Sequence, residues 1–233
     1  MLENYLLGGN TVAIDMNLSK PQRILLAAEQ VFSVYGFEKA TLDEIIALAD
    51  VGKGTVYRYF GNKEQLFFRL VDEKNRGFVE RLECAVAAQA GIEGKLLKYF
   101  EELVAFYRAN ASLWQIIFFE MLCNGRYILK EGINGELAAV PRYAGMKADA
   151  AEQELLLRYY RLIVGELDVF KNLIREGIVA GSLKDCNVDI SCRFFFFGVV
   201  MSIFNPTGDS RESLSNREAS DIIVDRYLNG ERL

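Results

Sequence analysis

The chain has 233 residues, of which 51% are hydrophobic and 25% charged, so it can bury a core and is not disordered on a large scale. Its formal net charge of −5 argues against a uniformly basic surface, and it contains no histidine. Because histidine is the commonest general base and the commonest transition-metal ligand, we expect no enzyme, no metal site and no cofactor.

Residues 1–18 show no clean periodicity and are expected to form a flexible N-terminal extension, with translation starting at either Met1 or Met16. They lack the basic region and apolar run of a secretory signal. The longest apolar run, Phe194 to Phe204, is shorter than the roughly 20 residues that span a bilayer. We therefore expect a cytoplasmic protein without a membrane partner. The four cysteines lack metal-site spacing and are expected to be reduced thiols, with no assigned role.

Three closely capped helices are predicted between residues 19 and 60. Ser19 and Gln22 form a capping box before the first helix, whose apolar face ends near Gly36. Thr41 and Glu44 form a second box before a short helix that ends near residue 49. After a turn at residues 50–52, a third helix runs over residues 53–60. This spacing predicts a helix-turn-helix unit over residues 19–66.

The remainder, residues 67–233, is predicted to be a larger helical domain. Asn62 can cap a long helix over residues 63–90, and further helices are expected over 93–109, 112–123, 148–179 and 190–204. A Gly-rich stretch over residues 124–145 is expected to be irregular, and a last helix runs from Ser215 to Gly230. The predicted fold class is therefore all-α.

The last long helices suggest a homodimer. In the helix over 148–179, apolar residues from Leu156 to Ile174 recur every three or four positions, and the helix over 190–204 is apolar on nearly all sides. A helix that is apolar on opposite faces needs cover on both, and a second subunit can provide it. The candidate interface residues are Phe170, Ile174, Phe194, Phe197, Met201 and Phe204.

Groups that bind a DNA backbone gather between residues 41 and 63. From Val51 through Lys63 the charged residues are Lys53, Arg58 and Lys63, with no acid among them. Hydroxyls, cationic groups and helix N-termini all donate to phosphate oxygens, and glycines permit close backbone approach. The candidate DNA-binding residues are Thr41, Lys53, Gly54, Thr55, Tyr57, Arg58, Tyr59 and Lys63. A plain capped surface helix is the alternative.

Residues 20–68 also resemble the N-terminal domain of TetR-family transcriptional regulators. The resemblance is carried without a gap by Arg23, Ile24, Ala27, Ala28, Phe32, Gly36, Thr41, Ile45, Ala49, Val51, Lys53-Gly54-Thr55, Tyr57, Tyr59-Phe60, Lys63 and Leu66. It implies that Thr41, Tyr57, Tyr59 and Lys63 hold phosphates, while Lys53, Thr55 and Arg58 lie nearest the bases. Gly52 departs from the family pattern, which has a small hydroxyl or alanine there, so a side-chain cap on the third helix is not expected.

The same resemblance implies an effector pocket in the helical body. The candidate lining residues are aromatic and favour a lipophilic or aromatic ligand; they are Tyr99, Phe106, Tyr107, Trp114, Phe118 and Tyr160. The alternative is that these rings are simply core. The resulting expectation is a ligand-responsive regulator, by default a repressor, that is released from a near-palindromic operator. A helical scaffold or binding protein without DNA binding is the alternative function.

Overall fold

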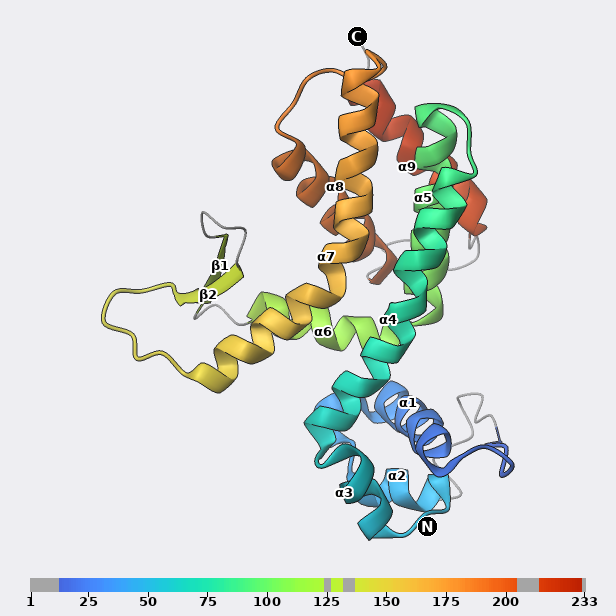
Figure 1. Ribbon diagram of the computed structural model, residues 1–233, viewed down its shortest axis with the longest axis vertical. Coiled ribbons are helices and arrows are strands. Elements are labelled where there is room, and N and C mark those ends of the chain that lie inside the picture. The colour runs from blue at the N-terminus through green and yellow to red at the C-terminus, as the bar shows by residue number, and fades with distance from the viewer. Residues whose placement is uncertain (1–12, 124–126, 132–136, 205–213, 232–233) are drawn as a thin grey trace. The chain divides into compact units, whose positions relative to one another are not determined.

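The computed structural model describes residues 13–123, 127–131, 137–204 and 214–231. The described residues form nine helices and one two-stranded hairpin (Figure 1), so the fold is mostly helical. They divide into two compact units, residues 1–75 and 76–233. Helix α4 (Lys63–Ala87) supplies residues to both units. Most of the expected 1–18 extension lies outside the described residues.

The first unit contains α1 (Lys20–Lys39), α2 (Leu42–Ala49), α3 (Lys53–Phe60) and the beginning of α4. The predicted caps are confirmed: the Gln22 carboxamide accepts from the Ser19 backbone at 3.1 Å, and Thr41 Oγ1 accepts from the Glu44 backbone at 3.2 Å. Asn62 Oδ1 likewise accepts from the Gln65 backbone at 2.8 Å. The expected break at Gly36 is also present, because Gly36 has φ of 72° inside the last part of α1.

Apolar side chains from all four helices fill the first unit. Phe32 and Phe67 meet edge to face with ring centroids 5.2 Å apart, and both are almost fully buried. Val56 and Phe60 of α3 are 1% and 8% exposed, which confirms that only these two α3 side chains turn toward the core. α3 therefore leaves most of its short surface free for another role.

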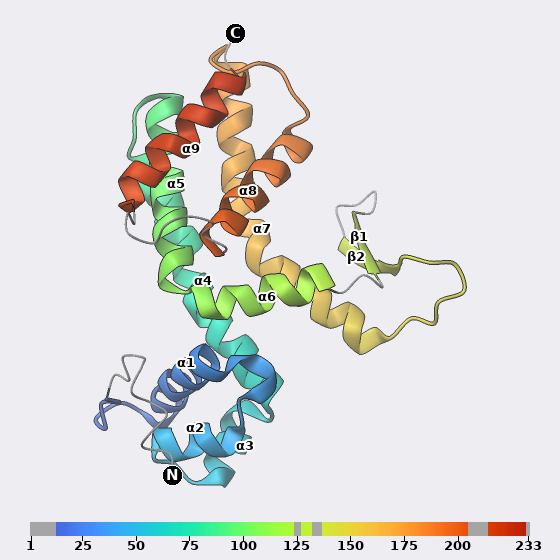
Figure 2. The same ribbon diagram turned by 180° about the vertical axis from the view of Figure 1, so that it is seen from behind.

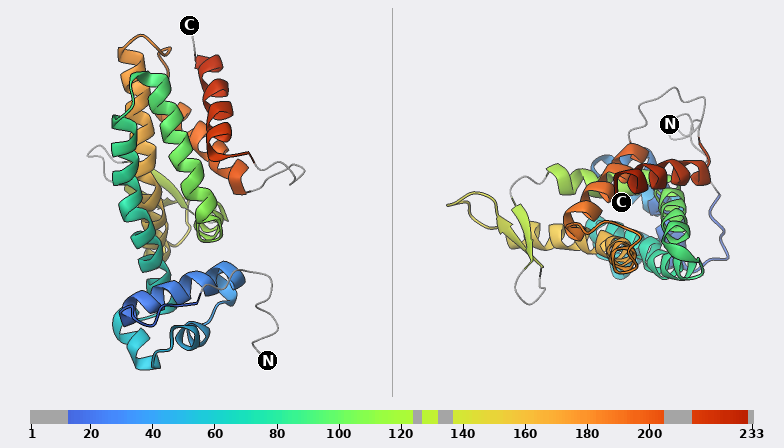
Figure 3. Two further views of the ribbon diagram at one scale, coloured as in Figure 1. Left: turned by 90° about the vertical axis from the view of Figure 1, so that its right-hand side faces the viewer. Right: turned by 90° about the horizontal axis from the view of Figure 1, so that it is seen from above.

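The second unit is built from the end of α4 together with α5 (Gly91–Ala109), α6 (Ala111–Cys123), α7 (Ala150–Val179), α8 (Val188–Phe204) and α9 (Asn216–Glu231). Each helix lies within about two residues of its predicted bounds, apart from the end of α4. The predicted apolar seam of α7 is buried from Leu156 to Ile174. α5 packs against α9, α7 and α8, as Figures 2 and 3 show.

The stretch predicted to be irregular contains a β-hairpin, which corrects that prediction within a fold that is otherwise helical, as expected. Strands β1 (Tyr127–Glu131) and β2 (Leu137–Pro141) pair antiparallel, with Leu129 opposite Ala139. Tyr127 and Ala139 are buried against Leu156 of α7, which gives the hairpin its own small core. Alternating apolar side chains can bury one face of a strand pair in this way.

A further property concerns hydropathy. Among the described residues, no helix combines the length and the apolar character that crossing a membrane requires.

Candidate nucleic-acid interface and ligand site

The turn between α2 and α3 sets the direction of α3. Asp50 ends α2 in the left-handed region, with φ of 49° and ψ of 58°. Gly52 occupies the N-cap of α3 without a side-chain cap, as expected, and the Thr55 backbone donates to the Gly52 carbonyl at 2.8 Å. The first turn of α3 is therefore held by its own backbone and by the burial of Val56 and Phe60.

The opposite side of α3 carries most of the predicted DNA-binding residues. Tyr57 and Tyr59 are each 47% exposed, while Lys53, Gly54 and Arg58 are also exposed and Thr55 is half-buried. A Cβ added at Gly54 would meet no atom within 4 Å. Packing inside the protein therefore does not require glycine there, whereas close approach of an external backbone would.

Charged partners modify this surface in a way that the linear sequence does not reveal. Lys53 Nζ lies 3.2 Å from Asp43 Oδ1 of α2, in a pair that is largely exposed. The stretch without acids, residues 51–63, thus receives an acidic neighbour from outside its own limits. The Arg58 guanidinium lies 4.9 Å from the Tyr59 ring centroid. Both residues are exposed, so the planar guanidinium group remains on an exposed face of α3.

Thr41 and Lys63 are engaged within the first unit. The Thr41 hydroxyl donates to Glu44 Oε2 at 2.8 Å while capping α2. Lys63 Nζ donates to the carbonyls of Phe37, Glu38 and Ala40 at 2.9, 3.2 and 3.2 Å, and lies 4.6 Å from the Phe37 ring centroid. Lys63 therefore ties the start of α4 to the end of α1, and its predicted phosphate contact stays a prediction.

Residues 24–70, which contain this helix-turn-helix, match the family model of bacterial regulatory proteins of the tetR family. The chain is a TetR-family transcriptional regulator. The resemblance noted in the sequence is thereby confirmed. TetR-family proteins bind DNA and are not enzymes, so the expectation of a regulator rather than an enzyme is also confirmed.

Similarity to known regulators extends beyond residues 24–70 and covers most of the chain. The regulator is 27% identical over 180 residues to the uncharacterized HTH-type transcriptional regulator YhgD of Bacillus subtilis, covering 76% of this chain and 78% of that one. It is 25% identical over 182 residues to the fatty acid metabolism regulator protein of the same organism, covering 78% and 79%.

Among solved structures, the regulator resembles that of FadR from Bacillus subtilis, which was determined in complex with stearoyl-CoA. The TM-score is 0.66 at 20% identity, and the match covers 90% of this chain and 98% of that one. At this identity the likeness establishes a shared fold, with a helical domain following the helix-turn-helix.

Four of the six predicted ligand residues, Phe106, Tyr107, Trp114 and Phe118, form one ring cluster in the second unit. Tyr107 of α5 is central, with ring centroids 5.5 Å from Phe106, 5.3 Å from Trp114 and 5.9 Å from Phe118. Tyr99, two turns earlier on α5, stacks on Phe170 of α7 at 5.1 Å. Tyr160 is half-buried on α7 and makes no ring contact with the other five in the described part of the chain.

Glu166 of α7 contacts Tyr99 and Tyr107 and was missed by the sequence analysis. Its side chain is fully buried, and Oε2 accepts a hydrogen bond from the Tyr107 hydroxyl at 2.7 Å. The Tyr99 hydroxyl donates to the Glu166 backbone carbonyl at 3.1 Å. Burial raises the pKa of Glu166 from 4.5 to about 8 against the opposing effect of the Tyr107 hydrogen bond. The sequence does contain a signal for a buried acid. Glu166 lies three residues after Ile163 and four before Phe170, so it falls on the apolar seam of the helix.

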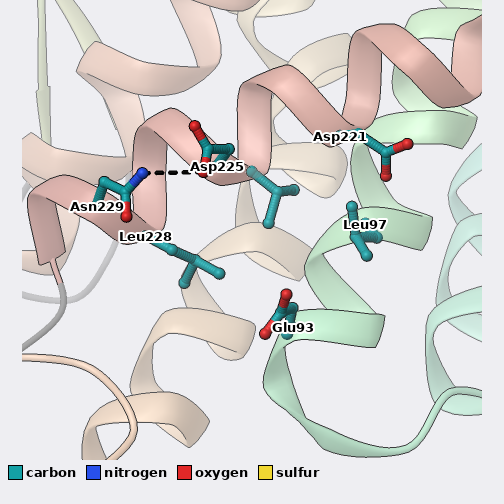
Figure 4. A pocket seen from close by; sticks show the side chains of 7 residues that line it. Glu93, Leu97, Asp221, Asp225, Leu228 and Asn229 are labelled. Atoms are coloured by element: carbon teal, nitrogen blue, oxygen red, sulfur yellow. Dashed lines mark hydrogen bonds between the residues drawn. The ribbon is translucent and has the colours of Figure 1, made fainter.

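A separate groove of about 220 Å³ lies between α5 and α9 (Figure 4). It is polar, and its carboxylates come from Glu93, Asp221 and Asp225, the last of which accepts a hydrogen bond from Asn229. None of the six predicted ligand residues lines this groove. In the described part of the chain, no group of three or more acidic or cysteine side chains is arranged to hold a metal ion.

The predicted dimer residues divide into two sets. Phe170 and Ile174 are fully buried inside the protomer, so the expectation that they contact a partner is corrected: their side chains complete the core of α7 instead. Phe194 of α8 is 81% exposed, and Phe197, Met201 and Phe204 are half-buried. Phe197 and Phe204 also contact the Phe118 ring, which places them between the core and the surface.

Proposed function

We propose that this regulator is a ligand-responsive repressor that binds a near-palindromic operator as a homodimer. Residues 19–66 act as the DNA-binding head, and residues 67–233 bind the effector and the second subunit. The single observation that carries the proposal is the exposed side of α3, with Tyr57, Arg58 and Tyr59 on a helix held from behind by two buried side chains. The site of action is the cytoplasm.

In this proposal α3 lies in the major groove. Tyr57, Tyr59 and the backbone at Gly54 contact the phosphates, and Lys53 and Thr55 lie nearest the bases. Arg58 reads sequence, because its guanidinium can donate two parallel hydrogen bonds to guanine O6 and N7. Thr41 and Lys63 join the phosphate contacts by exchanging one of their internal hydrogen bonds. A dimer places its two reading helices about 34 to 36 Å apart, one turn of DNA.

The second subunit is proposed to cover the exposed side of α8. Phe194 at 81% and Ile190 at 68% exposure leave apolar surface there that water would otherwise contact. Phe197, Met201 and Phe204 contribute their half-buried sides. Dimerisation therefore also fixes the distance between the two heads.

The effector is proposed to be a lipophilic or aromatic small molecule bound among Tyr99, Phe106, Tyr107, Trp114 and Phe118, with Tyr160 at the edge. The buried ring cluster supports this assignment, and so does the stearoyl-CoA complex of the FadR relative. Ligand entry must separate rings that touch, which displaces α5, α6 and α7 relative to one another. Operator affinity then falls tenfold for every 1.4 kcal/mol by which the ligand favours the displaced state.

The test is selection of bound duplexes from a random pool, followed by titration of the selected duplex. The expected product is an inverted repeat bound by two protomers with strong salt dependence. Enrichment of no sequence, together with no retention on duplex DNA at low salt, would indicate the alternative of a helical binding protein without DNA binding.

A further inference from the structure

The inference concerns Glu166 and deepens the proposed effector site, on which it rests. Glu166 lies on α7 with no exposed surface, and it contacts two tyrosines of α5. A fully buried carboxyl is rare unless it is paired with a cation or used for binding. Its surroundings therefore decide which of these applies.

No cation balances Glu166 among the described residues. Its carboxyl accepts from Tyr107 and its backbone carbonyl accepts from Tyr99, which Cys192 of α8 influences electrostatically. Burial raises the pKa of Tyr99, Tyr107 and Cys192. α4 packs against α7 at Gly165 through the apolar Val79, and α6 presents Trp114 and Phe118. The lysine of the same helix, Lys171, is occupied by Asp168 and Asp189. An unbalanced carboxyl in such surroundings holds its proton, in agreement with its pKa of about 8.

The two oxygens of Glu166 differ. Oε2 accepts from the Tyr107 hydroxyl at 2.7 Å, whereas Oε1 is buried without a hydrogen-bond partner in the described structure. A neutral carboxyl carries one proton, and Oε2 already acts as an acceptor. With Tyr107 donating to Oε2, the proton of the neutral carboxyl resides on Oε1, where it forms a donor that has no acceptor among the described residues.

We propose that Glu166 is the polar anchor of the effector site, and that its Oε1 hydroxyl donates to a carbonyl oxygen of a lipophilic ligand, as in a ketone, ester or thioester. Tyr107 orients the carboxyl, and the surrounding rings contact the apolar chain. A carbonyl ligand requires the protonated carboxyl of Glu166, whereas a cationic amine would require the ionised carboxylate.

The single tryptophan of the chain, Trp114, provides the readout. It is fully buried, and its ring centroid lies 5.3 Å from that of Tyr107. Its fluorescence is titrated, in the absence of DNA, with three probes of similar length: 2-undecanone, undecane and decylamine. At pH 7 the wild type is expected to bind the ketone about fivefold to tenfold more tightly than the alkane, since one neutral hydrogen bond separates them. Above pH 8 this preference is expected to disappear as the carboxyl ionises.

Two substitutions separate anchoring from packing. Glu166→Gln keeps a neutral donor, so its preference for the ketone should persist from pH 6 to 9.5. Glu166→Leu removes the donor and should bind ketone and alkane equally. Glu154→Gln, an exposed position on the same helix, should behave as wild type.

Several outcomes would overturn the anchor. They are an equal response of the wild type to ketone and alkane, no Trp114 response to the ketone, an unchanged preference in Glu166→Leu, or tighter binding of decylamine than of the ketone at pH 7. The proposed function can fail separately. If the protein shows the expected probe preference but binds no selected duplex, the role of Glu166 as anchor stands and the repressor function is refuted.

Discussion

Replacing Glu166 by glutamine should change how the stability of the protein depends on pH. The folded pKa of Glu166 is about 8, against 4.5 for an ordinary glutamate, so the folded protein holds a proton that the unfolded chain releases. The contribution of this group is complete below pH 4.5 and is lost as pH rises to about 8. At about 1.4 kcal/mol per pKa unit, the loss between pH 5 and 8 is about 4 kcal/mol.

The measurement is urea unfolding of the wild type and Glu166→Gln at half-unit intervals from pH 5 to 9. Because glutamine does not titrate, the variant's free energy of unfolding should rise relative to the wild type by about 4 kcal/mol and level off above pH 8. The control Glu154→Gln removes an exposed carboxylate and should track the wild type within about 0.5 kcal/mol. A difference between Glu166→Gln and wild type that stays constant over the range would refute a neutral buried carboxyl.

Three further predictions concern the head and the dimer. Gly54→Ala should raise the free energy of unfolding by about 0.5–1 kcal/mol in thermal unfolding, because the added Cβ meets no atom. The same variant should bind the selected duplex more weakly, and unchanged affinity would contradict close approach of the DNA backbone at this position. Lys63→Met should lower stability by about 1–2 kcal/mol through the loss of three carbonyl contacts, while a salt slope reduced by about one unit would add a phosphate role. Phe194→Asp should sediment as a monomer with unchanged helical content, and a persistent dimer would place the interface elsewhere.

The helical framework follows from the sequence because its signals are local. The Ser19, Thr41 and Asn62 caps act on backbone groups within three residues, and the α7 seam is defined by a spacing of three and four. Such features depend little on distant parts of the chain. The same holds for α3, where two apolar residues one turn apart determine which side is buried.

The hairpin was missed because its glycines were interpreted as a sign of irregular structure. The sequence between the strands contains Asn134-Gly135, a pair that is a sequence signal for hairpins. The roles of Lys63 and Lys53 depend on residues 10 to 26 positions away, which local patterns do not reveal. Phe170 and Ile174 were assigned to the dimer because an apolar seam does not indicate whether its cover comes from the same chain.

Glu166 illustrates a different limit. Its place on the apolar seam was visible, but an acid there can be solvated, paired or buried alone, and only the packing of α5 against α7 distinguishes these cases.

One titration tests sequence reading by α3 most directly. Wild type and Arg58→Ala are each titrated onto the duplex selected from the random pool and onto a scrambled duplex, at a single stated salt concentration. The wild type should prefer the selected duplex by at least a thousandfold, with two protomers bound, and Arg58→Ala should lose about tenfold or more of that preference. Equal affinity of the wild type for both duplexes, or an unaltered preference in Arg58→Ala, would contradict it.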